Sequence, residues 1–325
     1  MKGPIALTGS TGFVGQHLVK MLTEAGFPLR LLVREGPRTC GLGSAEVILG
    51  SLNDDAALDR LVSGASAVIH LAGAIAAPDR AQFFAINTGG TENLAKAAIA
   101  AGVERFIHVS SLSAREPGLS DYAASKRAGE DVLSTLRPEG LLIVRPPVVY
   151  GPGDRATLPL FAQLTRRIAF IPGTRQARFS LLFVEDLAKF LLDRLADDSH
   201  GLIEIDDGRP RGYDWSDLLV IAAEVEGRKA RAVFLPQWLL EALAWPVSRL
   251  GALFKLGIPL TLGKVRELYH RDWVVRATYP QSPGLRQFAE GFRLTIAWYR
   301  EQGWLPGKPA TDRTPPAKSY GEKSK

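Results

Sequence analysis

The chain has 325 residues, of which 46% are hydrophobic and 23% are charged, and its formal charge is +6. This composition is typical of a globular chain long enough to bury a large core, and no apolar run reaches the about 18 residues of a membrane span. Residues 308–325 carry five basic and two acidic side chains, about half of the excess charge (5 − 2 = 3). Elsewhere no basic run is interleaved with aromatic residues, so nucleic-acid binding is not expected.

The single cysteine and the two ends of the chain give expectations about location and order. Cys40 cannot form a disulfide within the chain, which fits a reducing compartment. The first residues run straight into an apolar segment, without the charged region and long apolar region of a secretion signal. We therefore expect a cytoplasmic protein. The tail 307–325 is rich in Pro, Lys and Ser and is expected to be disordered.

Apolar segments alternate with helix-like segments over the first half of the chain. Val14, Leu18, Leu22 and Ala25 lie on one helical face, which ends at Gly26. Strands are expected at 4–9, 28–34, 46–50, 67–73, 105–111 and 141–151. Their nearly continuous apolar character is typical of a parallel sheet covered on both faces. The pattern predicts an α/β fold, a doubly wound parallel sheet of the Rossmann type.

The chain changes in character after residue 150. A turn-forming cluster, GPGD (151–154), is followed by short helical segments and proline-rich loops, and five of the six tryptophans fall in the last third of the chain. We expect a first domain over 1–150 and a smaller, partly helical C-terminal lobe over 151–306. The segment 179–195 predicts a strand and a helix that return to the first domain.

Three glycines stand where the first predicted strand gives way to the first helix. In TGSTGFVG (8–15) they are Gly9, Gly12 and Gly15. A glycine-rich turn there lets the backbone approach a pyrophosphate, whose charge meets the N–H groups and the dipole of the helix N-terminus. The first domain is therefore expected to bind a dinucleotide through these glycines. Their neighbours in the turn are expected to contribute as well: Thr11, Phe13 and Val14.

The spacing G-x-x-G-x-x-G and four further motifs resemble the short-chain dehydrogenase/reductase superfamily, particularly its extended branch. The motifs are HLAG (70–73), VSSLS (109–113), YAASK (122–126) and RPPVVYGPGD (145–154), and Asn87 matches the asparagine of the family's fourth helix. The resemblance covers about the first 190 residues. It implies further cofactor contacts from five residues: Leu71, Ala72, Gly73, Pro146 and Val148.

The resemblance also implies a catalytic set of Ser111, Tyr122 and Lys126. A hydride moving between a carbinol carbon and a nicotinamide needs a proton to move on the oxygen, yet a phenol with a pKa of about 10 is a poor base near neutrality. Lys126 lies one helical turn from Tyr122, and with the charge of the nicotinamide it would lower that pKa. Ser111 would hydrogen-bond the substrate oxygen. Tyr122 and Lys126 are also expected to contact the cofactor, Lys126 through the nicotinamide ribose.

Arg34 follows the second predicted strand about 20 residues after the glycines, where NAD-selective enzymes place an acid on the ribose 2′-OH. A guanidinium can bind a 2′-phosphate in bidentate fashion, and Arg38 could assist. NADP is therefore the expected cofactor, with NAD as the alternative if Arg34 is only a solvated charge. Ser51 replaces the aspartate that the family usually has near the adenine, which leaves adenine recognition to Leu52 and the backbone.

Two features favour an apolar substrate. Val148 stands where many nucleotide-sugar epimerases of this branch have an asparagine. The segment 234–263 is very apolar, with charges only at Glu241, Arg249 and Lys255. This segment predicts either core helices of the second lobe or a lid over a lipid-like substrate near a membrane surface. Both features resemble the relatives that act on hydroxysteroids and dihydroflavonols more than those that act on nucleotide sugars.

No metal site is expected, because the five histidines show no metal-ligand spacing and no cluster with cysteine or carboxylates. We predict an NADP-preferring oxidoreductase that interconverts a secondary alcohol and a ketone on a small, fairly apolar substrate. The first alternative is a nucleotide-sugar epimerase or dehydratase that holds NAD tightly. The second is a redox-inert sensor or assembly subunit that binds a dinucleotide without turnover. The resemblance implies a homodimer formed through helices of the first domain.

Overall fold

The computed structural model describes four stretches of the chain: 3–34, 44–253, 261–276 and 284–307. Within the second stretch it gives only the backbone of residues 246–253. Arg38, Cys40 and the tail 308–325, which carry three of the expectations above, lie outside the described residues.

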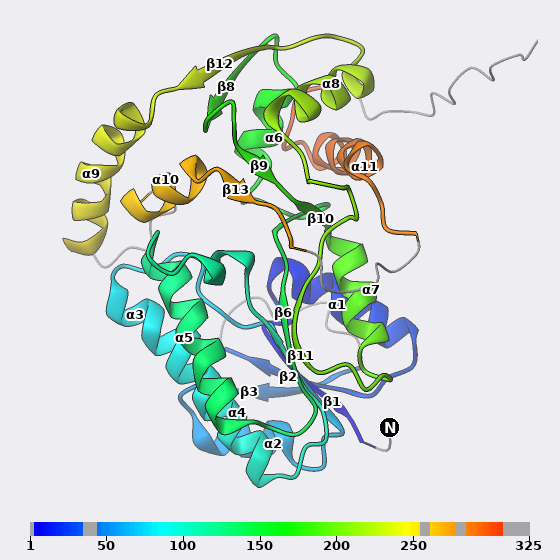
Figure 1. Ribbon diagram of the computed structural model, residues 1–325. Helices are drawn as coiled ribbons and strands as arrows, with labels where there is room; N and C mark the ends of the chain where they lie inside the picture. The colour runs from blue at the N-terminus through cyan, green and yellow to red at the C-terminus, as the bar shows by residue number, and fades with distance from the viewer. Residues whose placement is uncertain (1–2, 35–43, 254–260, 277–283, 308–325) are drawn as a thin grey trace, which may run out of the picture.

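A seven-stranded sheet with all its strands parallel forms the centre of the lower lobe (Figure 1). The strands follow the order β11-β6-β5-β4-β1-β2-β3 across the sheet. Their bounds are β1 Ile5–Thr8, β2 Leu29–Val33, β3 Glu46–Leu49, β4 Ala67–His70, β5 Phe106–Val109, β6 Leu141–Arg145 and β11 Gly201–Glu204. The doubly wound α/β fold predicted from the sequence is confirmed.

Helices cover both faces of this sheet because successive strand side chains point to opposite sides. Ile5 and Leu7 pack with residues of α1 and α7 in one buried cluster, whereas Ala6 packs with residues of α2, α4 and α5 in another. The bounds of these helices are α1 Phe13–Glu24, α7 Val184–Asp193, α2 Asp55–Val62, α4 Gly90–Ala100 and α5 Asp121–Leu136. Three short elements lie between β4 and α5 along the chain: helix α3 Arg80–Phe84, the π-helical turn η2 Ala85–Gly89 and the 3-10 turn η3 Leu112–Arg115.

The single strand predicted over 141–151 is wrong, because the structure has two strands there. β6 ends at Arg145, and Pro146 and Pro147 separate it from β7 (Val148–Tyr150). Proline has no N–H to donate to a sheet, so the pairing stops at this point. β7 instead pairs with β10 (Leu181–Phe183) outside the main sheet. This break leads the chain away from the carboxyl end of β6 into the second lobe.

The second lobe lies above the sheet in Figure 1 and has its own aromatic core. Phe161, Phe288 and Phe292 are almost fully buried there, and their rings contact one another. The remaining helices are α6 Leu158–Leu164, α8 Trp215–Glu226, α9 Gln237–Leu253, α10 Leu262–Tyr269 and α11 Phe288–Glu301. Two small parallel sheets complete it: β8 Ile168–Pro172 with β12 Arg231–Leu235, and β9 Arg178–Phe179 with β13 Asp272–Trp273. Among the described residues, no helix is long and apolar enough to cross a membrane.

Candidate active site

The glycine turn between β1 and α1 is held by close main-chain contacts. Gly9 has a φ of +78°, and a Cβ on it would lie 2.7 Å from the Ala72 backbone nitrogen. A Cβ on Gly15 would lie 2.1 Å from the Gly9 carbonyl oxygen. Gly12 caps α1 and offers no side-chain bond to the first N–H groups of the helix. The turn therefore leaves that helix end open to an anion, as a pyrophosphate site requires.

Most of the other residues expected to contact a cofactor lie at the same edge of the sheet. Leu71, Ala72 and Gly73 directly follow β4, and the Ala72 N–H donates to Thr8 Oγ1 at 3.3 Å. Arg34 follows β2 and its side chain is exposed. Thr11, Phe13 and Val14 lie half-buried at the start of α1, beside the glycines.

Leu52 follows the edge strand β3, and Pro146 follows β6. A Cβ on Gly90 would lie 2.7 Å from Leu52 Cδ1, and Asn93 Nδ2 donates to the Leu52 carbonyl at 3.0 Å. These contacts fasten Leu52 against the start of α4. The Pro146 carbonyl accepts a hydrogen bond from the Leu112 N–H at 2.8 Å, which fastens the proline break to η3.

The structure brings Ser111 and Tyr122 together. Ser111 caps η3 and accepts a hydrogen bond from the Ser113 N–H at 3.2 Å. Tyr122 lies in the first turn of α5. Burial raises the pKa of Tyr122 to about 12; a hydrogen bond with Ser111 lowers the pKa, and the Glu267 charge raises it. The phenol therefore keeps its proton near neutrality and can act as a proton donor.

Lys126 lies one turn further along α5 than Tyr122. Its Nζ donates a hydrogen bond to the Val109 carbonyl at 2.9 Å, and its side chain is buried. Burial lowers the pKa of Lys126 to about 8, with the Glu130 charge acting in the opposite direction. The lowering of the Tyr122 pKa that was expected from Lys126 is not found, because burial dominates and raises that pKa.

Asn87, in the π-helical turn η2, ties the glycine edge to α5. Its Nδ2 donates to the Ala74 carbonyl at 3.0 Å and to Ser125 Oγ at 2.9 Å, while its Oδ1 accepts from the Ala74 N–H at 2.7 Å. A Cβ on Gly73 would lie 3.1 Å from Asn87 Oδ1 and 3.8 Å from Lys126 Nζ. The chain segment after β4 is therefore held at a fixed distance from Lys126.

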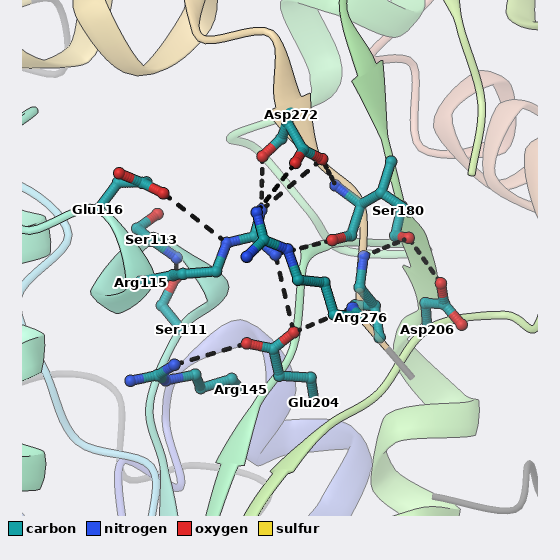
Figure 2. Close-up of polar contacts among 12 residues, drawn as sticks. Ser111, Ser113, Arg115, Glu116, Arg145, Ser180, Glu204, Asp206, Asp272 and Arg276 are labelled. Atoms are coloured by element: carbon teal, nitrogen blue, oxygen red, sulfur yellow. Dashed lines mark hydrogen bonds and ion pairs between the residues drawn. The ribbon is translucent and has the colours of Figure 1, made fainter. Parts of the chain in front are cut away.

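A row of paired charged side chains connects α5, which carries Tyr122 and Lys126, to the second lobe. The sequence analysis did not predict it. Glu130 accepts from Arg145 Nε at 2.9 Å, and Arg145 Nη1 lies 3.5 Å from Glu204. Figure 2 shows Arg115, at the end of η3, between Glu204 and Asp272, with ion-pair distances of 3.8 and 3.9 Å. This row joins α5, the sheet and β13. A buried arginine at the end of the apolar strand β6, Arg145, was the signal that could have revealed it.

A cavity of about 600 Å³ opens beside Ser111 and Tyr122. Its walls are largely apolar and come from distant parts of the chain. Val148, which the resemblance placed near the cofactor, lines it with an exposed side chain. Further apolar lining residues are Ile75, Phe83, Leu160, Trp215 and Leu262.

One part of the apolar segment 234–263 lines the cavity, and another part packs outside it. Thr261, Leu262 and Gly263 begin α10 and line the cavity. The described side chains of α9, residues 237–245, do not line it: Leu240 and Ala244 pack against α10, whereas Trp238 is exposed. Residues 254–260 of this segment lie outside the described part of the chain. The described residues thus form neither a plain core helix nor one continuous lid.

The buried histidines are structural in the described part of the chain, where no group of metal ligands occurs. His70 Nδ1 lies 2.7 Å from Thr8 Oγ1, and its Nε2 lies 2.9 Å from Thr91 Oγ1. Burial, with a smaller effect of Lys126, lowers the pKa of His70 to about 3. His70 is therefore neutral and holds β4 to β1 and α4.

Known proteins are similar to this chain in sequence and in fold. Residues 5–203 match the family described as the NAD dependent epimerase/dehydratase family. The chain is 43% identical to a ceramide reductase of Caulobacter vibrioides over 94% of this chain and 97% of that protein. It is 26% identical to a 4-hydroxy-2-methyl-3-oxo-4-farnesyl-3,4-dihydroquinoline-1-oxide ketoreductase of Stigmatella aurantiaca over 86% and 95% of the two chains. The structure of MoeE5 in complex with UDP-glucose and NAD is similar in fold, with a TM-score of 0.68, 23% identity, and 92% and 99% of the chains covered.

Proposed function

The chain belongs to the NAD-dependent epimerase/dehydratase family, and from that membership we propose that it is a reductase that converts a ketone on a long-chain lipid to a secondary alcohol. The coarser activity, that of an NAD(P)-dependent oxidoreductase of this family, rests on the family match and on the similarity to a reductase. One observation carries the finer proposal: the large apolar cavity beside Ser111 and Tyr122. A ceramide carries long alkyl chains next to a secondary alcohol, so the class of lipid handled by the similar ceramide reductase suits such walls.

The residues of the site fit a bound dinucleotide. The open start of α1 and the contacts that Gly9 and Gly15 make with the neighbouring backbone support a pyrophosphate at the glycine turn. We further propose that NADP is preferred, because Arg34 is exposed after β2 and no described acid replaces it there. Its guanidinium would bind a 2′-phosphate that a carboxylate would repel. When bound, the nicotinamide would supply the hydride.

We assign the proton transfer to the protein's own side chains. Tyr122 would give its proton to the ketone oxygen as the carbonyl carbon is reduced, so that the alcohol gains one proton and one hydride. Ser111 would donate a hydrogen bond to the same oxygen. Lys126 would stabilise the phenolate left on Tyr122, which then regains a proton from water. The raised pKa of Tyr122 supports the donor role, because the proton is present before the reaction starts.

The charges around the cavity argue against a nucleotide sugar. The lining includes the carboxylates of Asp79, Asp121 and Glu267. Its lysine, Lys264, lies 3.0 Å from Glu267 and is already paired. Asp121 is itself paired with Arg80 at 2.7 Å, so the described lining offers no unpaired lysine or arginine to the doubly charged pyrophosphate of a sugar nucleotide, and Asp79 would repel it. A ketone between alkyl chains meets no such repulsion.

The test is a comparison of substrates with the purified full chain. With NADPH, keto lipids and simple long-chain ketones should be reduced, with one NADPH oxidised for each alcohol formed. UDP- and GDP-sugars should neither raise the melting temperature nor compete with the ketone. Conversion of a nucleotide sugar without net change in the dinucleotide would overturn the proposal in favour of an epimerase.

A further inference from the structure

One face of the small sheet β8–β12 exposes apolar side chains to solvent. Ile168 is 49% exposed and Phe170 46%, while the alternate residues Ala169 and Ile171 are buried in the aromatic core. Arg231 and Val233 lie opposite Ile168 and Phe170 in the parallel register, and both are exposed. Cross-strand neighbours share a face, so these four side chains form one surface.

Helix α9 follows this surface along the chain and begins two residues after β12 ends. Leu240 and Ala244 on the inner side of α9 pack against α10. On the outer side, Trp238 is 68% exposed, and Leu243 and Trp245 are exposed as well. Figure 1 places α9 and the sheet β8–β12 at the outer border of the second lobe. We call the exposed residues of β8, β12 and α9 the outer face.

Basic side chains gather at one end of the outer face. Arg166 and Arg167 precede β8, and Arg228 and Lys229 precede β12; all four are exposed. The two groups meet, because the Arg231 N–H donates to the Arg167 carbonyl at 2.8 Å. The acid beside them, Glu226, accepts from Arg300 Nη2 at 2.6 Å and lies 4.0 Å from Arg228 Nη2, so it offsets part of the charge of this one arginine. The outer face therefore combines exposed apolar groups with an excess of positive charge.

We propose that the outer face docks on a bilayer that contains anionic phospholipid. The basic end complements the phosphate groups, and Trp238 with Phe170 suits the boundary between headgroups and acyl chains. A two-fold contact with a second copy is the other arrangement for an apolar face, but it would bring the same patch, with its cations, against itself.

Helix α10 connects the outer face to the cavity, so docking would bring the cavity close to the bilayer. This role of the docking rests on the proposed function. Val265 and Tyr269 of α10 pack with α9, while Leu262 and Leu268 of the same helix line the cavity. A lipid ketone resides in a bilayer, so a cavity one helix away from the membrane surface shortens its transfer. Trp238 and Phe170 do not line the cavity and should not affect the chemical step.

Sedimentation of the full chain with vesicles tests the docking without any substrate. The chain should bind phosphatidylcholine vesicles that contain phosphatidylglycerol, and bind those without it weakly. Arg166→Gln and Arg167→Gln should each weaken binding about fivefold, and Trp238→Ser about tenfold. Ile99→Ser, on α4 at the opposite lobe and 44% exposed, is the matched control and should bind like the parent chain.

Reduction of a soluble short-chain ketone, measured without vesicles, separates the two proposals. Trp238→Ser should retain that activity. Intact reduction with no vesicle binding would overturn the docking alone, whereas vesicle binding with no reduction of any ketone would support the docking and defeat the proposed function. If Trp238→Ser instead turns a dimer into a monomer in sedimentation velocity and leaves vesicle binding unchanged, the outer face is a contact between copies and the docking is wrong.

Discussion

The glycine-turn side of the site and the cavity side are built in different ways. On the glycine-turn side, main-chain atoms set the shape, because added Cβ atoms on Gly9 and Gly15 would collide with neighbouring backbone. On the cavity side, bulky side chains such as Leu160, Trp215 and Leu262 set the shape, and they come from three separate helices. The first side tolerates one residue type at its key positions, whereas the second tolerates any apolar side chain of suitable size.

Tyr122 lies where the two sides meet, and its substitution should have the largest effect. Tyr122→Phe removes the proton donor, so turnover should fall about 10²–10⁴-fold while folding and dinucleotide affinity change little. Tyr150→Phe is the control, because the Tyr150 hydroxyl is buried, lacks a partner among the described residues and does not line the cavity. Full activity in Tyr122→Phe would remove Tyr122 from the mechanism.

The pKa of Lys126 predicts how stability changes with pH. The folded chain releases this proton near pH 8 and the unfolded chain near 10.5, so between these values the unfolded state binds more protons and stability rises with pH. Relative to Lys126→Met, the parent chain should gain about 3 kcal/mol across this window. Urea unfolding of both chains at several pH values measures the difference. A difference that stays constant would mean that Lys126 is not desolvated.

Breaking the glycine-turn side at Gly15 should affect both folding and binding. Gly15→Ala places a methyl group 2.1 Å from the Gly9 carbonyl oxygen, so the turn must shift. We expect a loss of about 1–3 kcal/mol in the free energy of unfolding and a marked loss of dinucleotide affinity. Gly118→Ala meets nothing within 4 Å and serves as the control. Unchanged affinity in Gly15→Ala would show that the turn does not hold the dinucleotide.

Arg34 tests side-chain recognition on the glycine-turn side. NADP(H) should bind at least about tenfold tighter than NAD(H), about 1.4 kcal/mol, and Arg34→Ala should abolish this preference. Titration of both dinucleotides against tryptophan fluorescence measures the affinities. Lys20→Ala, an exposed cation on α1, should leave both unchanged. Equal affinities in the parent chain would contradict the assignment.

Single changes on the cavity side should alter kcat/KM least, because many apolar contacts share the binding of the substrate. In a series of ketones of increasing chain length, each added methylene should raise kcat/KM about fourfold until the cavity is full, because burying one methylene contributes about 0.8 kcal/mol. Steady-state rates over the series give the slope. A flat series would mean that the apolar walls do not bind the substrate.

The sequence predicted the glycine-turn side far better than the cavity side, for a physical reason. Gly9, Gly12 and Gly15 lie close together along the chain, and Tyr122 and Lys126 lie one helical turn apart. A short motif can therefore encode each group. That Leu160, Trp215 and Leu262 line one cavity depends on how distant helices pack, which no local pattern records.

The same limit explains the other differences. The strand β11, which joins the sheet beside β6, was not foreseen, and the Arg115–Glu204 pair joins residues 89 positions apart at 3.8 Å. The proline break after β6 was visible in the sequence but its effect on the sheet was not recognised. The catalytic roles, the domain division near residue 150, the cytoplasmic location and the homodimer stay predictions.

Transfer of a deuterium label tests the central claim most directly. The full chain is incubated with a long-chain keto lipid and NADPH deuterated at the transferable position of C4, and the products are analysed by mass spectrometry. The account predicts an alcohol with one deuterium on the carbinol carbon and one NADP⁺ formed for each alcohol. An unlabelled alcohol, or turnover of a sugar nucleotide with the dinucleotide unchanged at the end, would contradict it.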